Sequence, residues 1–158
     1  MRHEAAEALG AIGLDESLVL LERYLNDPMK EVSETCEIAV GRIRYEQRRR
    51  SGEKEQQQQQ QQQQQDEQGP FLSVDPAPPS APAPTSTLRE QLLNTSLPLF
   101  ERYRAMFALR NRCDEPAVLA LADGLQDSSA LFRHEIAYVL GQLAHKVSLA
   151  CFFFFFLL

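Results

Sequence analysis

Two short segments of the chain each place a histidine directly before a glutamate. His3-Glu4 and His134-Glu135 lie in a shared frame, Arg-His-Glu-x-Ala-x-x-Leu-Gly, which recurs with six identities in eleven positions. Imidazole and carboxylate are the ligands of non-haem iron sites, typically two histidines and one carboxylate per iron. Neighbouring helical residues point about 100° apart, so one pair chelates an ion poorly. Two facing helices would bring histidine and glutamate to the same ion, and the sequence therefore predicts one metal site with His3, Glu4, His134 and Glu135 as ligands.

A plainer interpretation is that both pairs are surface residues, alike only because the two halves were duplicated. The neighbouring repeats lack the pair, which favours the ligand interpretation. We expect Arg2 and Arg133 to orient or neutralise the glutamates. We expect the third histidine, His145, to be an ordinary surface residue, since no glutamate follows it.

The frame also recurs weakly at a fixed distance within each half. Leu9-Gly10 has a counterpart 31 residues later in Val40-Gly41, and Arg133 has one 31 residues earlier in Arg102. A period of about 30–40 residues without strand signals is typical of helical-hairpin solenoids. We therefore predict an all-α fold, a HEAT-type helical-repeat solenoid in two halves.

Apolar residues at helical spacing give the faces expected to form the core. In the first half these are Ala5, Ala8, Leu9, Ile12; Leu18, Leu21, Leu25; and Val32, Cys36, Ala39, Val40, Ile43. In the second half they are Phe100, Tyr103, Phe107; Val118, Leu121, Leu125; and Leu131, Ile136, Val139, Leu140, Leu143. Turn residues precede these helices and predict Asp or Ser N-caps near positions 15, 27, 114 and 127–129. The recurring glycines, Gly10 and Gly141, suggest close helix–helix approach.

Composition divides the chain into four segments. Residues 1–50 and 88–145 form the N-terminal and C-terminal HEAT-like repeats, joined by a disordered linker over 51–87. That linker holds ten consecutive glutamines, Gln56–Gln65, and a Pro-rich stretch over 75–87, expected to be extended and solvated. Residues 146–158 form an apolar tail with five consecutive phenylalanines. It is shorter than the roughly 20 residues of a spanning helix, so a membrane anchor is not expected, and we interpret it as an abnormal end foreign to the fold.

Charge and cysteine content narrow the class of protein. A formal net charge of −6 argues against nucleic-acid binding, which usually needs a basic surface. The three cysteines, Cys36, Cys113 and Cys151, form no CxxC pair, so a structural zinc site is not expected. Reduced cysteines, together with charged residues directly after Met1 in place of a signal peptide, predict a cytoplasmic protein.

Several stretches resemble the deoxyhypusine hydroxylase family. They are residues 2–13, 34–36, 71–79, 98–111 and 131–135, including Phe-Leu-Ser-Val-Asp-Pro-Ala-Pro-Pro and Pro-Leu-Phe-Glu-Arg-Tyr-Arg-Ala-Met-Phe-Ala-Leu-Arg-Asn. The resemblance covers roughly residues 2–50 and 69–144. It implies a di-iron monooxygenase that uses molecular oxygen to hydroxylate the deoxyhypusine side chain of a eukaryotic translation factor. Such enzymes have two facing HEAT-repeat halves and four His-Glu motifs, two in each half.

The resemblance also assigns roles to the residues of the two motifs. His3 and His134 become iron ligands, Glu135 reaches toward the iron held by the other half, and Glu4 serves the metal or the substrate amine. His3-Glu4 matches the second motif and His134-Glu135 the third, so we expect a truncated form with at most one iron and doubtful activity alone. The competing hypothesis is a non-catalytic HEAT scaffold for protein interaction, which needs no histidine at these positions.

Overall fold

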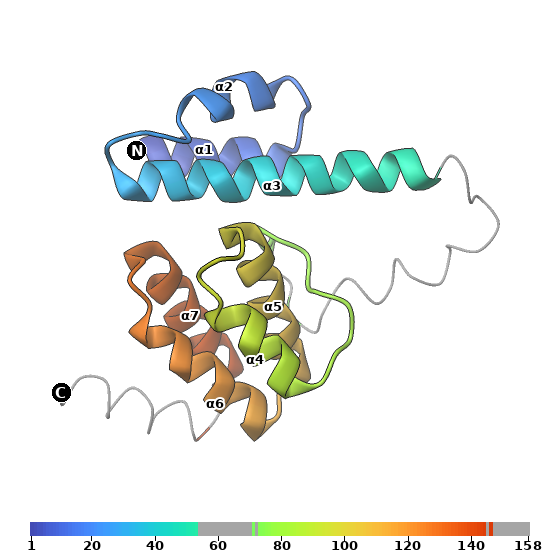
Figure 1. Cartoon of the computed structure of the whole chain (residues 1–158), viewed down its shortest axis with the longest axis vertical. Coiled ribbons are helices and arrows are strands. Elements are labelled where there is room, and N and C mark those ends of the chain that lie inside the picture. Colours follow the sequence, from blue (N-terminus) through green and yellow to red (C-terminus); the bar gives the residue numbers. More distant parts are fainter. Residues whose placement is uncertain (54–70, 72, 145, 147–158) are drawn as a thin grey trace. The chain divides into compact units, whose positions relative to one another are not determined.

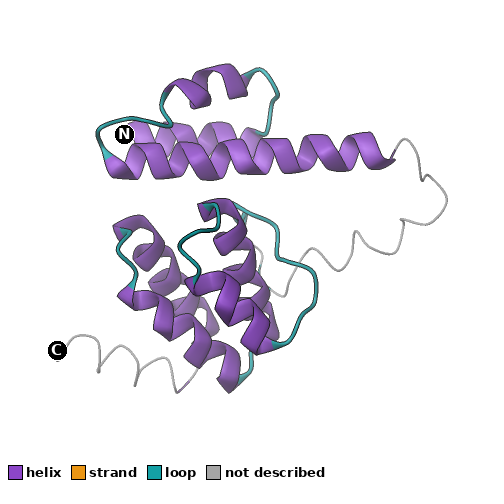
Figure 2. Cartoon of the chain, viewed as in Figure 1, coloured by secondary structure: helices purple, strands orange, loops and turns teal. Residues whose placement is uncertain are grey.

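The computed structural model describes residues 1–53, 71, 73–144 and 146, and all regular elements in that part of the chain are helices (Figures 1 and 2). They are α1 (Arg2–Ile12), α2 (Ser17–Arg23), α3 (Lys30–Glu53), α4 (Thr85–Leu93), α5 (Leu99–Arg112), α6 (Glu115–Asp123), the 3₁₀ turn η1 (Gly124–Gln126) and α7 (Ala130–Leu143). The predicted all-α fold is confirmed. The helices fall into two compact units, Met1–Pro78 and Pro79–Leu158. The glutamine run, His145, Cys151 and the phenylalanines of the tail lie outside the described residues.

In the first unit, α1 and α2 both pack on α3. The predicted face of α3 forms the core, together with Leu21 of α2, which is 1% exposed; the buried residues of α3 on this face are Val32, Cys36, Ala39, Val40 and Ile43. Cys36 is a free thiol, and burial, followed by the nearby charge of Asp27, raises its pKa.

The face of α1 that the sequence pattern predicted as core is largely open. Ala5, Ala8 and Ile12 are exposed, and the residues that meet α3 are Ala6 and Gly10. Of the predicted face only Leu9, which is half-buried, packs against the core, and the prediction is wrong for the other three residues because α3 approaches the side with the smallest residues. A Cβ on Gly10 would lie 2.8 Å from Cβ of Ala39, which confirms the expected close approach at this glycine.

In the second unit, α5 is the central helix. It contacts α4, α6 and α7, and ten of its fourteen residues are buried. Most residues predicted as core are buried, namely Phe100, Tyr103, Phe107, Val118, Leu121, Leu125, Ile136, Val139 and Leu140, while Leu131 and Leu143 are only partly covered. A Cβ on Gly141 would have no atom within 4 Å, so the close approach predicted at this position is wrong.

The two units contain the same hairpin with a constant offset of 100 residues. The first helix of each ends in a left-handed residue, Gly13 with φ 71° and Cys113 with φ 55°. The aspartate before the last helix of each accepts a backbone N–H two residues later, from Met29 to Asp27 (2.9 Å) and from Ser129 to Asp127 (2.7 Å). By this register α1, α2 and the start of α3 correspond to α5, α6 and α7. In the described part of the first unit, α4 has no counterpart.

The predicted helix caps are confirmed at two positions. Asp114 accepts the N–H of Ala117, and Ser129 accepts the N–H of Phe132. Asp15 is not a cap: α2 begins after Glu16, whose side chain makes no capping bond, and Asp15 pairs with Arg50 at 2.8 Å.

The Pro-rich stretch is irregular up to Pro84, but residues 85–87, which were expected to be extended, form the start of α4, and the stretch is not fully solvated. In the first unit, Arg42 donates to the carbonyl of Asp75 (2.6 Å) and Ala77 is fully buried. In the second unit, the N–H of Ser80 donates to the carbonyl of Arg104 (3.0 Å). Extended proline backbone cannot pair with itself, so it forms hydrogen bonds with the adjoining helices instead. The Arg42 guanidinium donates to it in the first unit, and the Arg104 carbonyl accepts from it in the second.

Candidate metal centre

The first His-Glu pair lies in the first turn of α1. His3 is half-buried and Glu4 is exposed. The N-terminal ammonium of Met1 lies 2.7 Å from Oε2 of Glu4. The hydrogen bond from this ammonium lowers the pKa of Glu4, and the charges of the ammonium and of His3 add to the effect. Glu4 is therefore an ionised carboxylate at neutral pH, already engaged with a primary ammonium group.

Arg2 neutralises a carboxylate, but that of Asp27 rather than Glu4. Its Nη1 lies 2.6 Å from Oδ2 of Asp27, whose side chain is only 4% exposed. In the second unit, Arg133 donates to the backbone carbonyl of Asp127. Arg2 thus ties α1 to the turn before α3, and Arg133 ties α7 to the turn before α7; both are positioning roles and differ from the one predicted.

The second His-Glu pair lies in α7, one turn from its start. Phe132 and Ile136 of α7 are fully buried. His134 is two residues from each, about 200° around the helix, and is exposed. Glu135 is half-buried. The packing of α7 therefore turns the imidazole of His134 away from the core of its own unit.

The two His-Glu helices do not hold corresponding places in the two units. α1 is the first helix of its unit, whereas α7 corresponds to α3. In the first unit Glu34-Thr35 stands where His134-Glu135 stands in the second, and Tyr103-Arg104 stands where His3-Glu4 would be. The shared frame thus lies on the first helix of the first unit and on the last described helix of the second unit.

Each unit by itself contributes one histidine and one glutamate from the two pairs. Within the described residues, no three His, Cys, Asp or Glu side chains gather into a group that would hold a metal ion. The donor types are those that iron takes, a neutral imidazole and a carboxylate. Neither pair is sealed inside a core. The side chains of the two His-Glu pairs are therefore of the types that bind iron. Each unit carries one histidine and one glutamate of this set.

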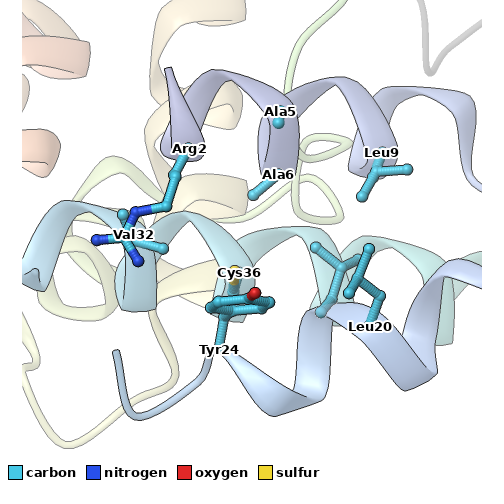
Figure 3. Close-up of a pocket in the computed structure, with 9 residues that line it drawn as sticks. Arg2, Ala5, Ala6, Leu9, Leu20, Tyr24, Val32 and Cys36 are labelled. Carbon is cyan, nitrogen blue, oxygen red and sulfur yellow. The ribbon is translucent and has the colours of Figure 1, made fainter. Parts of the chain in front are cut away.

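Sequence reasoning missed a pocket next to His3. It has a volume of about 190 Å³ and lies between α1, the end of α2 and α3 (Figure 3). It is lined by Arg2, Ala5, Ala6, Leu9, Leu20, Leu21, Tyr24, Val32 and Cys36. The small residues at positions 6 and 36 were the available signal, because the residues 100 positions later, at 106 and 136, are Met and Ile.

Comparisons with known proteins identify the type of repeat and the relatives. The family model described as PBS lyase HEAT-like repeat matches residues 1–27 and 101–127, the same two hairpins that the structure shows at an offset of 100. Deoxyhypusine hydroxylases of Mus musculus, Danio rerio and Homo sapiens are 54%, 55% and 53% identical over 94% of this chain. The chain is a homologue of the deoxyhypusine hydroxylases.

The fold of the chain also resembles that of a solved deoxyhypusine hydroxylase. The structure of human deoxyhypusine hydroxylase in complex with glycerol matches with a TM-score of 0.78 and 51% identity over 94% of this chain. The predicted HEAT-type fold is confirmed. The chain spans a little under half the length of the hydroxylases that it matches, 45–47% of each. In the described residues, no helix is both long enough and apolar enough to cross a membrane.

Proposed function

We propose that this chain works in the hydroxylation of deoxyhypusine in a eukaryotic translation factor, as an iron-dependent monooxygenase of the cytoplasm. The observation that carries the proposal is the identity of 53–55% with deoxyhypusine hydroxylases, together with the two His-Glu pairs, one on a helix of each unit. A non-catalytic HEAT scaffold for protein interaction would not require these two His-Glu pairs.

The residues of the two pairs have distinct tasks in this proposal. His3 and His134 supply imidazole ligands, and Glu135 supplies a carboxylate to the same ion. Bound iron provides the oxygen-activating redox chemistry that side chains lack. Since the chain carries two imidazoles and two carboxylates in its His-Glu pairs, we propose that it holds at most one iron.

Glu4 is suited to hold the cationic amine of the substrate. Its carboxylate is exposed and lies next to His3 in the first turn of α1. A carboxylate next to the His3 ligand would orient a protonated amine and fix the position of the neighbouring methylene groups. This charge-assisted contact is the kind that gives strong, directional binding.

Iron loading of histidine variants tests the proposal. The purified chain is loaded with Fe(II) without oxygen, dialysed, and its iron measured by mass spectrometry. We expect substoichiometric iron in the wild-type chain and none in His3→Ala or His134→Ala, because either change leaves one imidazole. His145→Ala, which removes the remaining histidine, is the matched control and should keep the wild-type content.

Two results would contradict the proposal. Iron retained in the His3→Ala, His134→Ala double variant would place the metal elsewhere. Tight, stoichiometric zinc in the wild-type chain would argue against an iron site. Turnover of a deoxyhypusine-bearing substrate is a separate measurement, and we expect none from the chain alone, since it carries two of the family's four His-Glu motifs.

A further inference from the structure

Arg2 and Asp27 form an ion pair that recurs in the second unit. Nη1 of Arg2 lies 2.6 Å from Oδ2 of Asp27, and the Asp27 side chain is only 4% exposed. The same spacing of 25 residues separates Arg102 from Asp127, which pair in the same way with both side chains almost fully buried. The pair therefore belongs to the repeated hairpin, where it joins the first helix, α1 or α5, to the turn before α3 or α7.

The carboxylate of Asp27 uses its two oxygens for two different helices. Oδ1 accepts the N–H of Met29 at 2.9 Å, just before α3 begins at Lys30, and Oδ2 holds Arg2 of α1. Hydrogen bonds to an ionised partner are shorter and stronger than those between neutral groups. Asp27 therefore couples the start of α3 to the turn of α1 that carries Arg2 and His3.

His3 lies on the side of α1 that faces α3. It precedes Gly10 by seven residues, which brings both residues to nearly the same side of a helix, about 20° apart. Gly10 is buried, and a Cβ there would lie 2.8 Å from Cβ of Ala39 in α3. His3 itself is half-buried, which agrees with this direction. Two contacts, Arg2 with Asp27 and Gly10 with Ala39, thus set how α1 is rotated against α3, and with it the direction of the His3 imidazole.

The second unit shows what such a pair does to the residue that follows the arginine. Tyr103, the counterpart of His3, follows Arg102 and is 1% exposed. Its ring centre lies 5.4 Å from that of Phe132 in the first turn of α7. The guanidinium of Arg102 lies 4.2 Å from the centre of the same Phe132 ring. The arginine and the residue after it are thus held together against the next helix that carries the repeat.

We propose that Asp27 is a positioning residue for the metal ligand His3, and that it acts through Arg2. This inference rests on the proposed function, in which His3 supplies an imidazole to iron. The charge of Asp27 holds Arg2, and this contact keeps the imidazole of His3 in one orientation before the metal binds. Partners behind a metal ligand raise affinity by orienting it, and loss of such a partner typically weakens metal binding by roughly 10–100-fold.

Asp27→Asn tests the proposal in the full chain. The amide keeps the shape of the side chain and can still accept the N–H of Met29, and the Arg2 side chain is 56% exposed, so it is solvated without its partner. We expect the concentration of Fe(II) at half-saturation, measured without oxygen in competition with a coloured chelator, to rise about tenfold. In the metal-free chain with 13C-labelled histidine, the imidazole NMR signals of His3 should shift, while those of His134 stay unchanged.

Two control variants separate positioning from net charge and from stability. Asp15→Asn makes the same change in the same unit, but in an exposed pair with Arg50, beyond the other end of α1. Ile43→Val removes a methyl group from the buried core of α3 and lowers stability without touching the Arg2–Asp27 pair. Both variants should keep the His3 signals and bind Fe(II) within about twofold of the wild-type chain, because neither change reaches the pair.

Four results would count against the proposal. Unchanged His3 signals in Asp27→Asn would show that the ion pair does not orient the imidazole. An equal loss of Fe(II) affinity in Ile43→Val and Asp27→Asn would assign the effect to stability. Wild-type affinity in Asp27→Asn, while His3→Ala loses the metal, would remove the role of Asp27 and leave the proposed function intact. Fe(II) retained in His3→Ala would instead contradict the proposed function, and this inference with it.

Discussion

At the scale of single residues, Arg102 joins three parts of the second unit. Its guanidinium pairs with the buried carboxylate of Asp127, donates to the carbonyl of Leu92, and lies 4.2 Å from the ring centre of Phe132. Both side chains of the ion pair are almost fully covered, 6% and 7% exposed. Removing one partner would leave a buried charge without compensation, which costs far more than the pair itself contributes.

Asp127→Ala should therefore destabilise the chain by about 3–5 kcal/mol. The matched control is Asp123→Ala, which removes an exposed pair with Arg89 at 2.6 Å and should cost no more than about 1 kcal/mol. Urea unfolding followed by circular dichroism gives both values. Equal losses in the two variants would show that burial of the Arg102 charge does not govern stability here.

At the scale of helices, the fit between neighbouring helices decides which glycines matter. Gly10 and Gly141 occupy the same position of the repeated frame, so the sequence treats them alike. The structure does not, because α3 contacts α1 at Gly10 while a Cβ on Gly141 would meet open space. Glycine in a helix interior is unfavourable by about 0.5–1 kcal/mol against alanine unless contact requires it.

Gly10→Ala and Gly141→Ala should consequently have opposite signs. We expect Gly10→Ala to destabilise by about 1–3 kcal/mol, since the added methyl overlaps the Cβ and Cα of Ala39. Gly141→Ala should stabilise by about 1 kcal/mol from helix propensity alone. Thermal unfolding of the two variants in parallel tests this, and stabilisation by both changes would rule out the close α1–α3 contact.

At the scale of the whole molecule, the two units differ in how much they bury. The second unit encloses the aromatic rings of Phe100, Tyr103, Phe107 and Phe132. Among the described residues of the first unit, no aromatic side chain is buried, and the α1–α2 face is open. Burial of apolar area is the main favourable term in folding, so the first unit should be the less stable.

Hydrogen exchange followed by mass spectrometry should show this difference directly. We expect amides of α1 to exchange at least tenfold faster than those of α5, because local opening costs less where fewer apolar contacts are broken. Equal protection of α1 and α5 would contradict the ranking of the two units.

The sequence by itself determined the helical class and the repeat. The spacing of apolar residues and the residue types at turns act locally. Residue order alone therefore gives the helix positions, the caps at Asp114 and Ser129, and the core faces of α3 and α5–α7. The repeated His-Glu pair indicates metal chemistry, because imidazole and carboxylate carry that property in any fold.

Only the tertiary structure decided which helix faces are buried and which charged side chains pair with one another. The apolar face of α1 is open because no described helix takes the place that α4 has in the second unit, and no pattern within α1 records its neighbours. Asp15 pairs with Arg50, and Arg2 with Asp27, since the packing of α1 and α2 on α3 brings residues 25–35 positions apart together. Periodicity specifies one helix at a time, whereas burial depends on every helix that surrounds it.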